Sequence, residues 1–339
     1  MKIKNLFIMS LAAFSLVACS NDGDVTPKTS NVVVNLASAA LETKATTKAE
    51  DFSTQALQSL TVEKAISSGS LYVFENDVLI TKVGITGNIV SIPNLTVGNT
   101  YSFAAVVNNT ATTAITKAGL KAEVIALSGK AAGNFVMYGE NLTNLTVQEV
   151  PEGGQNPNNV SIEVKRVLSG VQLVSIKTNF GENVPLFAKE GTAVVKSMQL
   201  LETNPTSRLD GGVIAAESGK IEGVGATLNL PFTKSETGVT VGDNNALRAY
   251  CCPGTIKYVV LNVTYTYKGT DYNRAYNITT LSNLDGGLLG NYLYGLKVTL
   301  SGAGSDAGGD PDKFESASAT LSVANWSNGQ IHDVPNQEN

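Results

Sequence analysis

The side chains that most often carry out nucleophilic, acid–base or metal chemistry are scarce in this sequence. The 339 residues include one histidine and three cysteines, and His332 lies near the end of the chain without a partner at a recognisable spacing. A histidine triad or a multi-histidine metal site needs several such groups, so both are nearly excluded. Carboxylates alone can do acid–base chemistry, but no stretch pairs acidic residues in a recognisable way. The sequence therefore predicts neither an enzyme nor a cofactor.

Two of the cysteines, Cys251 and Cys252, are adjacent. A disulfide between neighbouring residues is rare because the closed ring strains the peptide bond, and redox or metal function calls for C-x-x-C spacing or further ligands. We therefore expect two thiols in a strand or a turn. The glycine-rich segment 302–309 lacks the Lys-Ser/Thr pair of a phosphate-binding loop. Its neighbouring aspartates miss the calcium-loop spacing, so we expect a solvated hairpin loop.

The third cysteine, Cys19, closes an apolar run of residues 6–18 that begins after two lysines and ends before a polar stretch. Spanning a bilayer takes roughly 20 apolar residues, so the run is too short and instead describes a secretory signal peptide over residues 1–18. The sequence Leu16-Val17-Ala18-Cys19 resembles the lipobox of bacterial lipoproteins, in which the cysteine is acylated. The alternative is an ordinary signal peptide with a chance cysteine. The lipobox implies attachment to the outer membrane through lipid.

Composition bounds the class of protein. The chain is 42% hydrophobic and 16% charged, which supports folded cores. Its length is enough for two domains of ordinary size. A net charge of −5 argues against nucleic acid as a partner, because nucleic-acid binding needs a basic face.

Hydrophobic patterning along the chain predicts an all-β protein with minor helix. Alternation and β-branched content predict strands at residues 31–36, 71–74, 78–80, 89–92, 101–109, 134–139, 160–167, 171–176, 192–201, 261–267, 272–278, 292–300 and 317–326. Helical spacing predicts short helices within 59–66 and 110–127. Short strands with frequent turns indicate β-sandwiches rather than a parallel sheet.

The clearest change of composition lies at residues 151–159, where proline, glycine and asparagine crowd together without an apolar residue to bury. We expect this segment to link an N-terminal domain at 31–150 to a C-terminal domain at 160–339. Residues 19–30 form a polar linker that follows the lipid-bearing cysteine.

The aromatic residues of the second half have two interpretations. Tyr265, Tyr267, Tyr272 and Tyr276 lie across one predicted hairpin, where aromatic cross-strand pairs stabilise a sheet. They could instead form an aromatic ligand face. Trp326 ends an alternating strand, which is typical of a core residue, and its alternative role is a sugar platform.

The order of several segments resembles the fimbrillins, the shaft subunits of the type V pili of Bacteroidetes, over nearly the whole chain. The resemblance is carried by Cys19, 71–74 with its acidic hairpin, 100–108, 135–139, 164–171, 291–296 and the final strand ending at 325–326. It implies two tandem transthyretin-like β-sandwich domains. It also implies a surface protease that removes the lipidated N-terminus together with the first strand, opening a groove that a C-terminal strand of the next subunit fills.

Carried over to this sequence, the resemblance places the excised strand at Val32, Val33, Val34 and Leu36. It places the cut after Lys44 or Lys48, although on residues alone these are solvated lysines in the polar loop 42–50. The donor segment would lie within residues 321–334. The residues expected to fill the next subunit's groove are Leu321, Val323, Trp326, Ile331 and Val334.

One departure from the family pattern concerns the protease. The familiar processing site is an arginine, whereas the first arginine of this chain is Arg166. Either a protease that accepts lysine cuts the loop, or the subunit stays uncut as an anchor. The leading hypothesis is a non-enzymatic fimbrial subunit that forms a homo-polymer by donor-strand exchange for adhesion to a host or bacterial surface receptor. The alternatives are a glycan-binding surface lipoprotein and an anchor or tip subunit outside the shaft.

Overall fold

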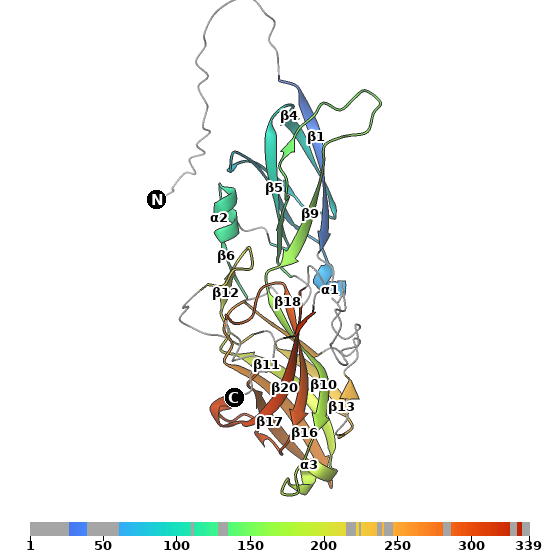
Figure 1. Cartoon of the computed structure of the whole chain (residues 1–339), viewed down its shortest axis with the longest axis vertical. Coiled ribbons are helices and arrows are strands. Elements are labelled where there is room, and N and C mark those ends of the chain that lie inside the picture. The colour runs from blue at the N-terminus through green and yellow to red at the C-terminus, as the bar shows by residue number, and fades with distance from the viewer. Residues whose placement is uncertain are drawn as a thin grey trace, which may run out of the picture.

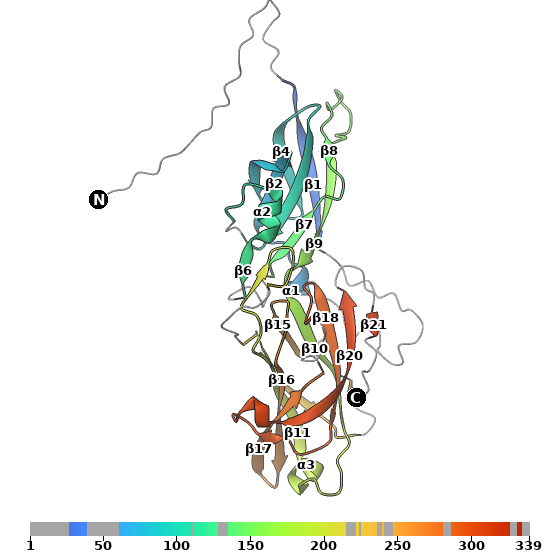
Figure 2. The same ribbon diagram turned by 60° about the vertical axis from the view of Figure 1, so that its left-hand side comes forward.

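The structure is a computed structural model that describes residues 27–38, 61–109, 112–127, 135–214, 222–223, 225–235, 239–240, 247–280, 286–325 and 331–333. Over these residues the chain is almost entirely β and forms two domains stacked end to end along the long axis (Figure 1). The view from the side shows the same elongated stack (Figure 2). Among the described residues, no helix has the length and apolarity that crossing a bilayer takes.

The N-terminal domain is one sheet in the order β3-β2-β5-β7-β9-β1-β4, with β8 paired to β5. Its strands are β1 (Thr29–Ser38), β2 (Gly69–Glu75), β3 (Val78–Gly84), β4 (Ile89–Thr96), β5 (Thr100–Val107), β7 (Met137–Glu140), β8 (Leu145–Thr146) and β9 (Asn159–Arg166). The predicted hairpin between β2 and β3 is confirmed. Asn76 and Asp77 both have positive φ (50° and 66°), as the tight turn of a two-residue hairpin requires.

The C-terminal domain is built on a larger sheet in the order β13-β11-β16-β17-β20-β18-β10-β14, with β15, β19 and β21 paired at its sides. Its strands are β10 (Ser169–Thr178), β11 (Thr192–Leu201), β13 (Ala226–Phe232), β14 (Val239–Thr240), β15 (Leu247–Cys251), β16 (Tyr258–Tyr267), β17 (Thr270–Ile278), β18 (Tyr292–Leu300), β19 (Ser305–Asp306), β20 (Glu315–Asn325) and β21 (Ile331–Asp333). β20 joins the two halves of this sheet, because it pairs with β18 on one edge and with β17 and β21 on the other.

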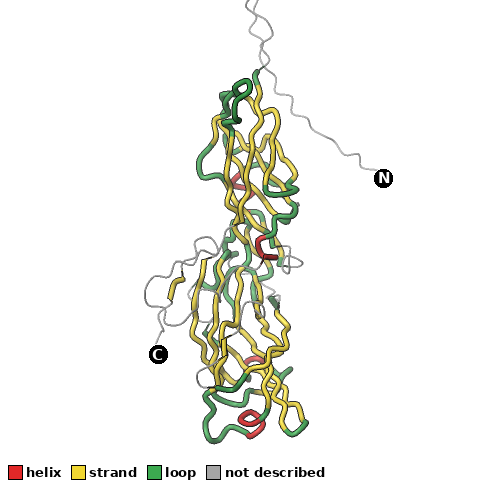
Figure 3. Tube along the Cα trace, turned by 90° about the vertical axis from the view of Figure 1, so that its right-hand side faces the viewer, coloured by secondary structure: helices red, strands yellow, loops and turns green. Residues whose placement is uncertain are grey.

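Short helices lie beside the N-terminal sheet, at the junction of the domains and at the far end of the C-terminal domain (Figure 3). They are α1 (Thr61–Lys64), α2 (Lys117–Ala122), α3 (Leu186–Glu190) and the 3-10 turn η2 (Pro311–Lys313), and β6 (Val124–Ala126) paired with β12 (Thr206–Arg208) forms a two-stranded ribbon. The predicted helix over 110–127 is therefore only partly right, since it covers α2 but runs into β6. The pairing of β6 with β12 brings Leu209 from the second half against the outer face of the N-terminal sheet.

The predicted all-β, two-sandwich fold is confirmed, but the predicted division at residues 151–159 is wrong. This segment connects β8 to β9 within the N-terminal sheet, where β9 pairs with β1 and β7. The chain crosses to the C-terminal domain at residues 167–168, between β9 and β10. Proline, glycine and asparagine mark a solvated loop there, and a loop of this composition can lie within a domain as well as between domains.

The interior of the C-terminal domain contains cysteine and tyrosine side chains whose roles had alternative interpretations in the sequence. Cys251 and Cys252 are buried and, among the described residues, form no disulfide; Cys251 ends β15 and Cys252 follows it, so both thiols lie in a strand or turn, as expected. Tyr265 and Tyr276 are fully buried and share a hydrogen bond of 2.7 Å between their hydroxyls. Burial raises the pKa of Tyr265 to about 12, so both hydroxyls are neutral at physiological pH.

Candidate functional site

The first strand, β1, occupies an interior position in the N-terminal sheet although it is first in the chain. It pairs antiparallel with β4 and parallel with β9, so both of its edges are hydrogen-bonded. Among the described strands, β4 has β1 as its only paired neighbour. Removing β1 would therefore open a gap with unpaired backbone groups along β9 on one side and β4 on the other.

The side chains of β1 alternate strictly between the core and the surface. Val32 and Val34 are 0% exposed and Leu36 is 4% exposed, and all three pack in the N-terminal core with residues of β2, β4, β5 and β9. Val33 points to the outer face and is half-buried. The alternation follows from the two-residue period of a strand, and it makes β1 a plug with three apolar side chains.

A polar contact fixes the start of β1. Ser30 is the first inward residue of the strand, and its Oγ accepts a hydrogen bond of 3.1 Å from Nδ2 of Asn158. Asn158 is fully buried and also bonds both backbone groups of Gln148, accepting from N at 2.8 Å and donating to O at 2.8 Å. These bonds fix which end of the Asn158 amide is nitrogen, since a backbone N–H can only donate and a carbonyl can only accept.

A second polar contact lies where β1 ends. Arg166, the last residue of β9, is 1% exposed, and its Nη2 lies 3.3 Å from Oγ of Ser38. Its Nε donates to the backbone oxygen of Glu63 at 2.7 Å. Burial lowers the pKa of the Arg166 side chain to about 10. Arg166 thus contacts the residues on both sides of segment 39–60, which joins β1 to α1.

The side chain of Glu63 ties α1 to the C-terminal domain. Its carboxylate is 0% exposed and receives Nη1 of Arg248 at 3.0 Å and the hydroxyl of Tyr250 at 2.5 Å. Nε of Arg248 donates to Gln172 at 2.8 Å. Burial, followed by the charge of Glu63, raises the pKa of Tyr250. A buried ion pair of this kind holds its partners firmly, because separating them would leave a charge without compensation.

The predicted donor residues lie in the other domain, so one molecule does not bring its own acceptor and donor segments together. Leu321 and Val323 belong to β20, and Ile331 belongs to β21. Trp326 and Val334 lie outside the described residues, as do Cys19, Lys44 and Lys48. Their predicted roles in sugar binding, strand donation, lipidation and processing stay predictions.

The aromatic ligand face does not form from the tyrosines proposed for it. Tyr265 and Tyr276 are in the core. The ring of Tyr272 stacks on Phe187 with 4.3 Å between ring centroids, and Nζ of Lys268 lies 5.0 Å from the ring of Tyr267. The hairpin therefore uses these rings for packing, which agrees with the cross-strand interpretation.

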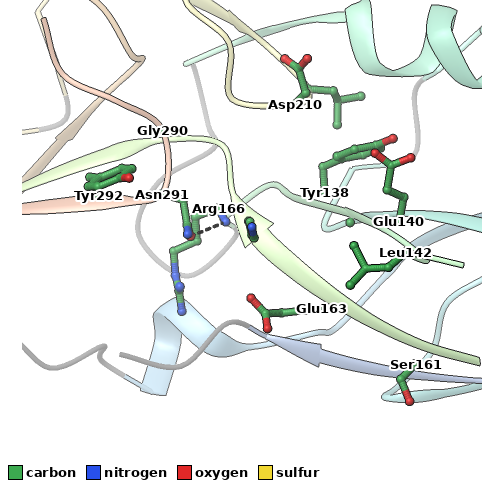
Figure 4. A pocket seen from close by; sticks show the side chains of 13 residues that line it. Tyr138, Glu140, Leu142, Ser161, Glu163, Arg166, Asp210, Gly290, Asn291 and Tyr292 are labelled. Carbon is green, nitrogen blue, oxygen red and sulfur yellow. Dashed lines mark hydrogen bonds between the residues drawn. The ribbon is translucent and has the colours of Figure 1, made fainter. Parts of the chain in front are cut away.

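A cavity of about 720 Å³ lies at the junction of the two domains (Figure 4). Tyr138, Glu140 and Lys165 line it from the N-terminal sheet, and Asp210 and Asn291 line it from the second half of the chain. Two of its carboxylates are held in ion pairs, Glu140 with Lys117 (2.8 Å) and Lys121 (2.5 Å), and Asp210 with Arg208 (2.5 Å). These ion pairs tie β7 to α2 through Glu140 and hold Asp210 beside Arg208.

Sequence reasoning missed the polar residues that hold β1 and α1 in place, namely Asn158, Arg166, Glu63 and Arg248. Glu63 and Arg248 are 185 residues apart, and Ser30 and Asn158 are 128 apart, so no local spacing links them. The available signal was weak: Arg166 follows Val160, Ile162 and Val164 at the next inward position of β9, where alternation assigns it to the core.

Comparison with known proteins supports the fold. No protein-family model and no curated protein matches the sequence. A candidate cell adhesion protein from Parabacteroides distasonis ATCC 8503 matches with a TM-score of 0.56 at 15% identity, covering 89% of this chain and 98% of that one. A candidate cell adhesion protein from Bacteroides eggerthii DSM 20697 matches with a TM-score of 0.50 at 18% identity, covering 90% and 98%. At such identities the likeness establishes the fold, and the fold expected from the fimbrillin resemblance is confirmed.

Proposed function

We propose that this protein is a structural subunit of a cell-surface fimbria and that β1 is a temporary plug in its N-terminal domain. The observation that carries the proposal is the position of β1. It is hydrogen-bonded on both edges and buries three alternating apolar side chains. Its only covalent link to the rest of the described domain is segment 39–60. A cut in that segment removes the covalent link without touching a described strand.

The physical consequence of losing β1 favours association with another chain. Each apolar side chain withdrawn from the core exposes a pocket, at a cost of about 1.5–3 kcal/mol per side chain. The facing edges of β4 and β9 also lose their hydrogen-bonding partner. An extended segment of a second subunit restores both the ladder and the packing, which is recognition by strand addition.

The junction keeps the remainder of the chain intact after such a cut. Glu63 lies in α1, on the part that stays, and its carboxylate is bound by Arg248 and Tyr250 of the C-terminal domain. α1, the first described element after the cut, is therefore held between the two domains while β1 and everything before it departs. In the precursor, we propose that acylated Cys19 tethers the chain to the outer membrane and that a protease cuts after Lys44 or Lys48.

The processing step is tested by N-terminal sequencing of protein extracted from the cell surface. We expect chains that begin at Ala45 or Ala49. Doubly substituted Lys44→Ala/Lys48→Ala protein should keep β1 and stay attached to the membrane. A blocked, lipidated Cys19 on every copy would instead identify an uncut anchor subunit and overturn the plug.

The assembly step is tested in the purified protein without its signal peptide. A recognition sequence for a site-specific protease, inserted between Thr46 and Thr47, allows one defined cut. Electron microscopy should show polymers after the cut, in the presence of fimbrial subunits from the same cell surface, and monomers in the uncut control. Monomers in both samples, with β1 shown to be released, would refute a shaft or junction role.

A further inference from the structure

The groove occupied by β1 has an apolar centre and a polar contact at each end. The inward residues of β1 are Ser30, Val32, Val34, Leu36 and Ser38 in order along the strand. The central three fill the core. The outer two are hydroxyl residues that meet Asn158 at the start and Arg166 at the end. Any strand that replaces β1 inherits these five positions.

The start of the groove requires a hydrogen-bond acceptor. Asn158 is 0% exposed, and its orientation is fixed by the two backbone bonds to Gln148. One amide hydrogen of Nδ2 is used by the Gln148 carbonyl, and the other faces Oγ of Ser30 at 3.1 Å, with the backbone oxygen of Asn31 more distant at 3.5 Å. An occupant with an apolar residue at this position would leave a buried donor without that acceptor, which costs free energy.

The end of the groove repeats the requirement with a charged donor. Nη2 of Arg166 lies 3.3 Å from Oγ of Ser38; the arginine is 1% exposed and the serine is half-buried. The two polar ends are eight residues apart in the chain, and a strand cannot slip by one residue without turning its apolar side chains outward. A slip by two residues would move a hydroxyl into an apolar pocket and an apolar residue onto Asn158.

Building on the proposed function, we infer that the groove selects its occupant by a five-position pattern: a hydroxyl residue, three apolar residues and a second hydroxyl residue, each separated by one outward residue. The pattern identifies the kind of partner. It is an extended segment of another fimbrial subunit that carries hydroxyl residues at both ends of an alternating apolar run.

The final residues of this chain do not carry that pattern. Within 321–339 no three apolar residues stand at alternate positions; a strand through Ile331 would place Asp333 at the next inward position. A carboxylate in an apolar pocket is strongly unfavourable. Ala319, Leu321 and Val323 do alternate, but they lie in β20, where all three pair with β18 and Val323 also pairs with β21. We therefore infer that the groove accepts a strand from a different subunit rather than from a second copy through residues 321–339.

The experiment uses the full chain with the protease site between Thr46 and Thr47. After the cut, β1 is held by non-covalent contacts, and a fluorescent peptide of residues 28–39 competes for the groove. We expect the wild-type peptide to enter and a peptide with Ser30→Ala to bind about fivefold more weakly. A peptide with Val34→Asp should lose binding by on the order of a hundredfold or more. A peptide with Asn35→Ala, an outward position, is the matched control and should bind like the wild type.

Two further arms separate the possible occupants. A peptide of residues 326–339 should not displace β1. Pre-cut protein with Asn158→Ala should bind the wild-type and Ser30→Ala peptides equally, and if this variant fails to fold the peptide series stands on its own. Equal binding of the wild-type and Ser30→Ala peptides, or efficient entry of the 326–339 peptide, would contradict the five-position pattern. It would not contradict the proposed role of β1 as a removable strand. If no peptide binds, including the wild type, both the proposed role of β1 and the five-position pattern are contradicted.

Discussion

Two strands near opposite ends of the chain, β1 and β20, look alike in their sheets but are built into them differently. Each has a hydrogen-bonded neighbour on both edges. β1 lies between β4 and β9 near one edge of its sheet. Removing it leaves the order β3-β2-β5-β7-β9 unbroken and separates only the edge strand β4. β20 is the link between β17 and β18, so removing it divides the C-terminal sheet into two.

The difference shows that a strand with neighbours on both edges is not necessarily essential to the rest of its sheet. β1 is suited to the proposed role of a plug, because the five strands from β3 to β9 stay paired without it and another strand can reproduce its contacts. β20 is essential to its domain, because it links the two halves of the C-terminal sheet. This contrast narrows the predicted donor segment, since releasing Leu321 and Val323 would break the pairing of β20 with β18. Ile331, in β21, is paired only with β20 and is the easier of these residues to release.

The largest expected effect comes from deleting β20 and trying to restore the fold with a peptide of the same sequence. Deleting residues 315–339 should prevent folding of the C-terminal domain, because it separates the two halves of the sheet, and a peptide of 315–325 should not rescue it. Deleting only 331–339 should leave the thermal midpoint nearly unchanged. Near-ultraviolet circular dichroism reports both results. A cooperative, native-like spectrum after the larger deletion would show that β20 is as dispensable as we propose β1 to be.

The second test concerns the anchor that follows β1. Replacing Glu63 with alanine leaves Arg248 buried without its carboxylate, and we expect a loss of about 3–5 kcal/mol in the free energy of unfolding. Lys64→Ala changes the neighbouring exposed residue and should have almost no effect. Urea unfolding monitored by fluorescence measures both variants. An unchanged midpoint for Glu63→Ala would mean that the junction does not hold α1.

The third test measures how tightly the plug is packed. Leu36→Ala removes a buried side chain from the core, and we expect a loss of about 2–5 kcal/mol, depending on how far the pocket collapses. Val33→Ala, on the outer face of the same strand, should cost roughly 0.5 kcal/mol. Denaturant titration gives both values. Equal losses would contradict the inward and outward alternation of β1.

The smallest effect is a pH dependence beside β20. Tyr294 lies opposite Val323 in the pairing of β18 with β20, and burial raises its pKa to about 12 from the ordinary 10.0. The folded state therefore holds this proton more tightly than the unfolded state. Its contribution to stability is complete below pH 10 and is lost between pH 10 and 12, at about 1.4 kcal/mol per pH unit.

Thermal unfolding between pH 8 and 11 tests this dependence. Tyr294→Phe should reduce the slope above pH 10, although it also removes the hydroxyl that accepts from the backbone N–H of Leu289. Tyr292→Phe, two residues earlier on the same strand, is the matched control. An identical slope in the wild type and the Tyr294→Phe variant would place the titration elsewhere.

Much of the fold could be predicted because strand alternation and tight turns are local. The β-branched run Val32-Val33-Val34 indicated a strand, and Lys268-Gly269 marked the turn between β16 and β17. The division into domains could not be predicted in the same way. Residues 151–159 have the composition of a linker, and only the pairing of β9 with β1 shows that they stay within one domain.

The sequence by itself determined that this is an all-β chain with few groups for catalysis and that β1 has a strand's alternating faces, because these properties depend on composition and on a period of two residues. The tertiary structure decided that β1 lies between β4 and β9, that β20 joins the C-terminal sheet, and that Asn158 and Arg166 meet the hydroxyls of β1. The physical reason is that these contacts join residues more than a hundred positions apart. Their partners are selected by the packing of whole sheets rather than by any local pattern.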